Sequence, residues 1–177
     1  VKDGAWSIFI LYLTRKGGEE ATKDYLNPLV KEATQILIDE VYEPHHAHYK
    51  DDFGTLIEGF FSDEPRFGNE KGTEARIGSD MVLPWREGLE KELEFDAKYL
   101  PLLWVNANGA EAEIRYRYMD LITTLYRDNF TNVLSDWCHA HGVMYLGHTI
   151  EDNGAHARLG YGTGHYFRGQ ETMDYAG

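Results

Sequence analysis

The amino-acid sequence predicts an α/β fold built on a parallel sheet. Residues 6–13 and 56–61 are nearly continuous apolar stretches, which is typical of strands buried on both faces. Residues 143–148 supply a third stretch of this kind, and segments with helical spacing of apolar residues separate the three. Strands that alternate with helices favour a parallel sheet with crossover connections.

The first helix has a clear predicted start. Asn27 is a favourable N-cap, and Pro28 follows in the first helical position, where its missing N–H costs nothing. Apolar residues then recur at helical spacing as far as Val41, and Pro44 is expected to kink or end the helix.

A second, longer helix is predicted over residues 112–141, with Gly142 as the residue that ends it. This helix is expected to cross over between the strands at 56–61 and 143–148. Those two strands are therefore predicted to be parallel neighbours.

Residues 66–110 form a long insertion that is rich in glycine, proline and charge, and we treat it as an insertion subdomain. A helix is possible over residues 87–99. Because the insertion leaves from the carboxyl end of a strand, we expect Trp85 or Trp104 to lie near a site at that end.

Composition narrows the function. The chain has 177 residues, ordinary globular composition and a formal net charge of -13, which argues against nucleic acid and anionic membrane partners. Simple solubility is the plainest reading of this charge, and a neutral substrate fits it. Cys138 is the single cysteine, and neither a signal peptide nor a cofactor motif is evident. A cytoplasmic location is weakly favoured, and no cofactor is expected.

Two pairs of acidic residues directly follow predicted strands: Asp63-Glu64 and Glu151-Asp152. In parallel α/β folds, active sites lie at the carboxyl ends of strands. Two carboxylates there can flank a glycosidic bond, one as general acid and the other as nucleophile or base. Glu64 and Glu151 are the predicted catalytic pair. A cap or a salt bridge to Arg66 is the alternative for the first pair, and an Asx-turn is the alternative for the second.

Strand alternation assigns a side to each residue around this pair. Glu64 is expected to face the cleft with Phe60 and Ser62. Phe61 and Asp63 are expected to face the helices, with Asp63 held by a structural partner.

Other polar and aromatic residues are weaker candidates for contact with a substrate. His148 ends the third strand and is predicted to bind a sugar hydroxyl or to position Glu151, although a core histidine is equally consistent. His165 lies in a glycine-flanked loop, and Asp63, Trp85 and Asp152 complete the predicted substrate-binding set.

Two groups of histidines invite a metal-site interpretation: residues 45, 46 and 48, and residues 139 and 141. Within each group the spacing does not converge as i, i+4 does in metalloprotease helices. Both groups lie near predicted helix C-termini, where the helix dipole favours histidine. No metal site is predicted.

Four stretches of the sequence together resemble large bacterial TIM-barrel glycoside hydrolases of α-L-rhamnosidase-like pattern. They are residues 24–28 (Asp-Tyr-Leu-Asn-Pro), 59–65 (Gly-Phe-Phe-Ser-Asp-Glu-Pro), 83–85 (Leu-Pro-Trp) and 136–142 (Asp-Trp-Cys-His-Ala-His-Gly) leading to Gly147-His148. The resemblance implies that residues 1–177 are a segment of a catalytic (β/α)₈ barrel, with about three βα units. It also implies that Glu64 is the acid and that the rest of a parent polypeptide completes the enzyme. A plant or host glycan is the expected substrate, although the resemblance does not specify one. The second carboxylate is then either Glu151 or a residue on a later barrel strand, and in the latter case the isolated segment is expected to be inactive.

Two further hypotheses compete with a glycosidase. The first is a non-catalytic carbohydrate-binding or scaffold domain, and the second is a metal-dependent hydrolase. A separation of about 5–10 Å between the Glu64 and Glu151 carboxyl groups across an open cleft would favour catalysis.

Overall fold

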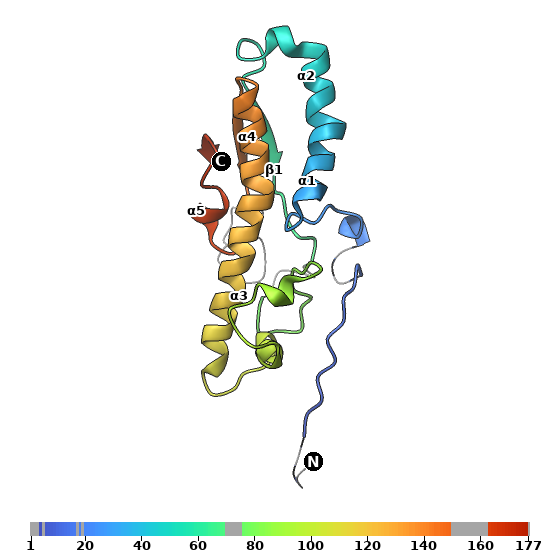
Figure 1. The fold of residues 1–177 in the computed structure, drawn as a ribbon, viewed down its shortest axis with the longest axis vertical. Coiled ribbons are helices and arrows are strands. Elements are labelled where there is room, and N and C mark those ends of the chain that lie inside the picture. Colours follow the sequence, from blue (N-terminus) through green and yellow to red (C-terminus); the bar gives the residue numbers. More distant parts are fainter. Residues whose placement is uncertain are drawn as a thin grey trace.

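The computed structural model describes residues 4, 6–16, 18, 20–69, 76–149 and 163–176, which form a small parallel sheet flanked by two long helical arms (Figure 1). The strands are β1 (Gly59–Asp63), β2 (Met144–His148) and β3 (Tyr175–Ala176), in the order β1-β2-β3. Both pairings are parallel. The predicted parallel pairing of the second and third apolar stretches is therefore confirmed.

The prediction of a partial (β/α)₈ barrel is wrong. Over the described residues the chain is helix-rich and has one small open sheet, with two strands of five residues and one of two. Residues 6–13, predicted as the first strand, are outside any strand and exposed, as Ile8 is at 88%. An apolar run indicates that a segment is suited to burial in a sheet. To form a strand it must also pair with the edge of another strand, and the apolar pattern does not specify that partner.

The first helical arm consists of α1 (Lys31–Leu37), a π-helical turn (Ile38–Tyr42) and α2 (Glu43–Tyr49). It begins later than predicted, because Asn27 caps a preceding turn: its Oδ1 accepts a hydrogen bond of 3.0 Å from the Leu29 N–H. Pro44 does not end the arm. It is the second residue of α2, where the missing N–H breaks no regular α-helical bond.

The second arm runs through α3 (Ala110–Tyr126), another π-helical turn (Arg127–Thr131) and α4 (Asn132–Ala140). It connects β1 to β2 through the insertion, as predicted. Gly142 ends the arm with a φ of +72°, a left-handed conformation that glycine adopts without strain.

The described part of the insertion lies beyond the carboxyl end of β1, on the side that the sequence predicts (Figure 1). In place of one helix over 87–99 it forms two short 3₁₀ helices, Leu89–Lys91 and Ala97–Leu103. Residues 163–176, which we call the tail, add the short α5 (Tyr166–Gly169) before β3. None of the described helices is both long and apolar enough to cross a membrane.

The helices cover one face of the sheet. On this face Phe60 stacks on Tyr42 at a ring separation of 4.4 Å, and its ring lies 5.6 Å from that of Trp137. Phe61 points to the other face and is 60% exposed, and the Asp63 side chain is 80% exposed. The predicted assignment of Phe61 and Asp63 to the helix side is therefore wrong. Two adjacent phenylalanines fit either register, so the pattern alone does not determine which one faces the core.

Candidate functional site

The carboxyl ends of β1 and β2 meet side by side. The parallel register pairs the last residues of the two strands, Asp63 and His148. His148 Nε2 lies 2.9 Å from Asp63 Oδ1, so the imidazole N–H donates to the carboxylate. The Asp63 side chain is 80% exposed and the His148 side chain 21%. Asp63 was expected to have a structural partner, and in the structure His148 is such a partner.

Glu64 directly follows this pair and has a left-handed backbone, with φ at 45°. A residue other than glycine rarely adopts this conformation, and such strain is often retained at functional sites. Regular strand alternation consequently ends at Asp63, so it cannot be used to assign the side on which Glu64 lies.

Glu64 lines a small pocket between the end of β1 and the first helical arm. The volume is about 150 Å³, and the apolar part of the wall comes from Tyr25, Leu26, Pro28, Leu37, Pro65 and Phe130. Asp63 and Arg66 complete the lining. A half-buried acidic residue in the wall of a mostly apolar concavity is a common arrangement in ligand-binding sites. The pocket is nevertheless below the roughly 300–1,000 Å³ that drug-sized ligands occupy.

Hydroxyl groups behind the site hold the strands in register. Tyr145 Oη donates to Ser62 Oγ at 3.0 Å. Burial raises the pKa of Tyr145 far above its ordinary value, and it raises the pKa of Tyr42 to about 12. Both phenols therefore stay protonated near neutral pH and act in packing and hydrogen bonding.

Cys138 is likewise unsuited to chemistry. Burial, reinforced by the nearby Asp174, raises the pKa of its thiol to about 12. It remains a packed thiol inside α4, as the sequence indicates.

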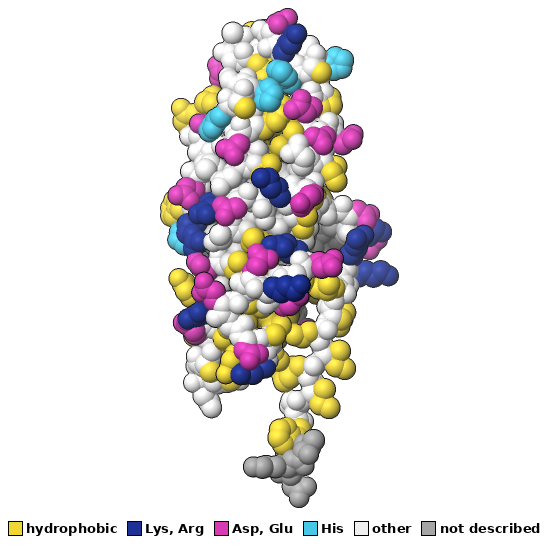
Figure 2. Space-filling model, in the orientation of Figure 1, with side chains coloured by type: hydrophobic (Ala, Val, Ile, Leu, Met, Phe, Trp, Pro, Cys, Tyr) yellow, Lys and Arg dark blue, Asp and Glu magenta, His cyan; other side chains and the backbone are white. Residues whose placement is uncertain are grey.

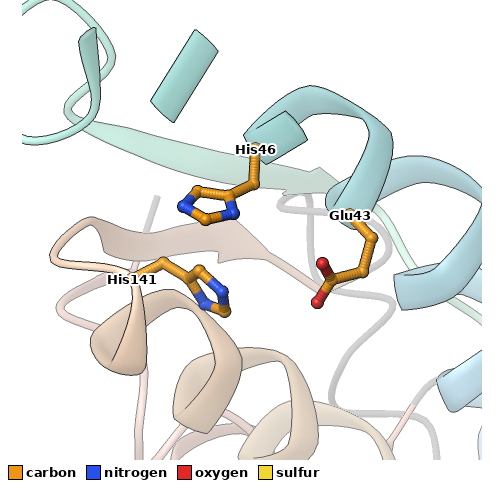
Figure 3. Close-up of side chains that lie close together, drawn as sticks. All are labelled: Glu43, His46 and His141. Atoms are coloured by element: carbon orange, nitrogen blue, oxygen red, sulfur yellow. The ribbon is translucent and has the colours of Figure 1, made fainter. Parts of the chain in front are cut away.

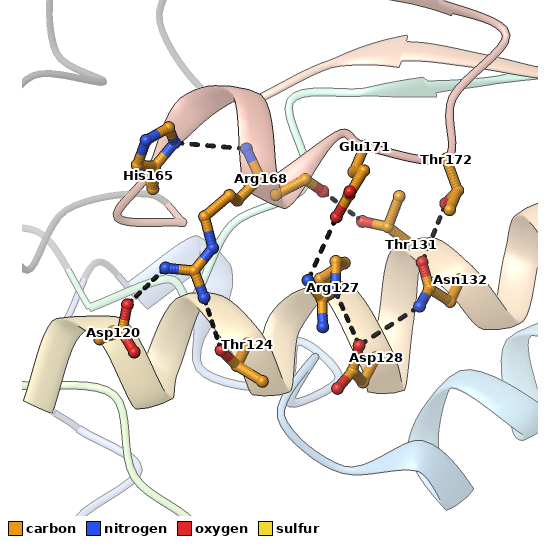
Figure 4. Close-up of polar contacts among 11 residues, drawn as sticks. Asp120, Thr124, Arg127, Asp128, Thr131, Asn132, His165, Arg168, Glu171 and Thr172 are labelled. Atoms are coloured by element: carbon orange, nitrogen blue, oxygen red, sulfur yellow. Dashed lines mark hydrogen bonds and ion pairs between the residues drawn. The ribbon is translucent and has the colours of Figure 1, made fainter. Parts of the chain in front are cut away.

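His165 caps a helix. Its ring Nδ1 accepts a hydrogen bond of 3.3 Å from the Arg168 N–H at the start of α5 (Figure 4). The Arg168 guanidinium binds Asp120 and Thr124 on α3. The His165 side chain therefore has a structural role as the cap of α5, while the Arg168 side chain joins α5 to α3.

Trp85 lies in the insertion, half-buried against the hydrophobic core. Its carbonyl oxygen accepts a hydrogen bond of 2.8 Å from Asn27 Nδ2, which ties the insertion to the segment preceding the first arm. It also lines a wide hollow of about 770 Å³ that the exposed residues 12–15 help to enclose. Trp104 donates from Nε1 to the Met81 carbonyl at 2.7 Å within the insertion.

Glu151 and Asp152, the second predicted pair, lie outside the described residues. The structure thus brings together Asp63, Glu64 and His148 from the predicted set. Sequence reasoning missed the Asp63–His148 contact, although both residues were predicted to end neighbouring parallel strands, and that register was a sufficient signal.

Comparisons with protein-family models, with curated proteins and with solved structures give no match to this chain.

Proposed function

We propose that the chain contributes the acid/base carboxylate of a glycoside hydrolase, with Glu64 as the general acid. The observation that carries this proposal is the position of Glu64: a half-buried residue with a strained backbone, at a strand end and in the wall of a mostly apolar pocket. The resemblance of residues 59–65 to a glycosidase strand end supports the same assignment.

In the proposed reaction, Glu64 gives its proton to the glycosidic oxygen as the bond from that oxygen to the anomeric carbon breaks. A water molecule supplies the new oxygen on the anomeric carbon and loses a proton to a carboxylate, either directly or after a glycosyl–enzyme intermediate. Glu151 is the proposed second carboxylate. The hydrogen-bonded Asp63 and His148 are positioning residues beside the acid.

The surroundings favour a neutral carbohydrate. The formal charge of -13 disfavours an anionic substrate. Phe61 is 60% exposed with its ring 5.8 Å from that of His148, which gives an apolar surface for the C–H face of a sugar next to a polar group. Contacts from Trp85, Asp152 and His165 to a glycan stay predictions.

The size of the pocket favours a second candidate function, carbohydrate binding without catalysis. A volume of about 150 Å³ accommodates one small group but not two sugar rings across a scissile bond. A binding or scaffold domain needs only the exposed Phe61 face and the polar Asp63–His148 pair.

Kinetics with aryl glycosides test the acid role. The 177-residue chain, and any longer polypeptide that contains it, is screened with glycosides of good and poor leaving groups. Glu64→Gln should lower turnover by about 10²–10⁴-fold on poor leaving groups, which need protonation, and far less on good ones. The matched control is Glu58→Gln, an exposed carboxyl group just before β1 that should leave both rates unchanged.

Equal activity of Glu64→Gln and wild type on a poor leaving group would overturn the acid assignment. Saturable glycan binding without turnover, lost on Phe61→Ala, would establish the second candidate instead.

A further inference from the structure

Three potential metal ligands converge at the other end of the sheet. Glu43 and His46 lie one turn apart on α2, and His141 directly follows α4. One ligand atom from each lies within 4.8 Å of the other two (Figure 3). Histidine side chains gather on the surface at this end of the molecule (Figure 2).

The imidazole of His141 has one nitrogen available as a ligand. Its Nδ1 lies 2.7 Å from the Trp137 carbonyl oxygen, which can only accept, so Nδ1 carries the proton. In the neutral ring this leaves the lone pair on Nε2. Histidines that bind metals generally donate their other N–H to a carbonyl or carboxylate in this way.

The carboxylate of Glu43 is held by the same neighbour. Trp137 Nε1 donates to Glu43 Oε1 at 2.7 Å, which leaves Oε2 for another partner. Trp137 is only 8% exposed, and its ring stacks on that of His141 at 4.0 Å. One rigid, buried residue therefore positions two of the three candidate ligands.

The third ligand is held by packing. The half-buried ring of His46 lies edge-on to Phe53 at 5.2 Å and to His141 at 4.4 Å. These contacts limit its rotation and keep it beside the other two groups.

We propose that Glu43, His46 and His141 bind a divalent transition-metal ion of the zinc type, with water as the fourth ligand, and that this ion clamps α2 to the end of α4. Two imidazoles and one carboxylate are a standard zinc ligand set, and a water completes the tetrahedron in three-ligand sites. Zinc bonds of about 2.0–2.2 Å place ligand atoms about 3.3 Å apart, so a small closure from within 4.8 Å suffices. Glu43 is exposed, so its Oε2 can move toward the two imidazoles while Oε1 keeps its hydrogen bond from Trp137 Nε1.

This site does not depend on the proposed glycosidase chemistry, since it lies where the helices end and the strands begin. The sequence does not predict this site, because the spacing within each histidine group does not bring its side chains together. The fold takes one histidine from each group and adds Glu43.

Zinc binding to the 177-residue chain is measured by competition with a chromophoric chelator, alongside thermal unfolding. We expect a 1:1 complex. At free Zn²⁺ about 100 times Kd, Tm should rise by about 5–10 °C. His46→Ala and Glu43→Gln should each weaken binding about tenfold or more. His48→Ala changes an exposed histidine on the same helix outside the cluster, and it should bind Zn²⁺ as wild type does.

A further variant tests the positioning role of Trp137. Trp137→Phe keeps an aromatic ring but lacks the N–H donor to Glu43, and it should weaken zinc binding by about 10–100-fold. Glu43→Gln keeps an acceptor for Trp137 Nε1, so its folding should be least affected. Absence of zinc binding by wild type, or an equal loss in His48→Ala and His46→Ala, would overturn the proposal.

Discussion

The two ends of the β1–β2 pair carry polar clusters built in different ways. At the carboxyl end, Asp63 is the last residue of β1 and has an exposed side chain, and Glu64 follows it with a left-handed backbone. At the amino end, Glu43, His46 and His141 come from helical segments and pack around Trp137. The first cluster has an exposed carboxylate and a strained backbone, whereas the second is supported by a buried aromatic residue.

This difference follows from what the chain does at each end. Strand ends open into loops, where a side chain can be presented with few constraints. Helix C-termini favour histidine through the dipole, and the turns between helix and strand bring separate helices together. We therefore expect substitutions at the amino end to affect stability and those at the carboxyl end to affect the proposed glycosidase function.

The largest effect should come from removing the support of the amino end. Trp137→Ala should lower the free energy of unfolding by about 3–5 kcal/mol, because it removes a buried ring in contact with Tyr42, Phe60 and His141. Phe61→Ala, on the exposed sheet face, should change it by only about 0.5 kcal/mol. Urea denaturation measures both, and comparable losses would remove the distinction between the two regions.

A smaller effect on the free energy of unfolding, and one of opposite sign, is expected at the carboxyl end. Glycine relieves left-handed strain, so Glu64→Gly should raise the free energy of unfolding by about 0.5–1 kcal/mol while removing the proposed acid. The same substitution at Glu58, which has a negative φ, should destabilise the chain. Destabilisation by Glu64→Gly would show that the side chain contributes more in packing than its backbone costs in strain.

Sequence patterns predict the local elements of this fold better than the number of strands that pair in its sheet. Continuous apolar character identifies β1 and β2, and Gly142 marks the end of the second arm, because both depend on neighbouring residues alone. Residues 6–13 show the same apolar character without forming a strand. Their burial depends on a partner edge, and strand pairing is a long-range property that a local pattern does not contain.

The candidate sites show the same limit. Carboxylates at strand ends are visible in sequence because topology places them, and the contact of Asp63 with His148 follows from register. The amino-end cluster joins α2 to the end of α4, which are far apart in the chain. The spacing of Glu43 and His46 was an available signal, but only the packing of Trp137 brings His141 to them.

The smallest predicted effect concerns the stability of the fold at low pH. Asp174 Oδ2 accepts hydrogen bonds from the Tyr145 N–H at 2.8 Å and from His139 Nε2 at 2.9 Å, which ties the tail to the amino half of β2 and to α4. Burial alone would raise the pKa of this carboxyl group, but the two hydrogen bonds lower it overall below its ordinary value of 3.8.

Because the folded pKa is the lower one, the ionised carboxylate of Asp174 stabilises the fold fully above the unfolded pKa, and this contribution is lost as pH falls through the folded pKa. Wild type should thus lose stability on acidification below about pH 4, and Asp174→Asn should show a shallower loss in urea midpoints recorded from about pH 5 to pH 2. The partly exposed position of Asp174 keeps the difference small, and identical pH profiles for the two proteins would show that other carboxylates govern acid unfolding.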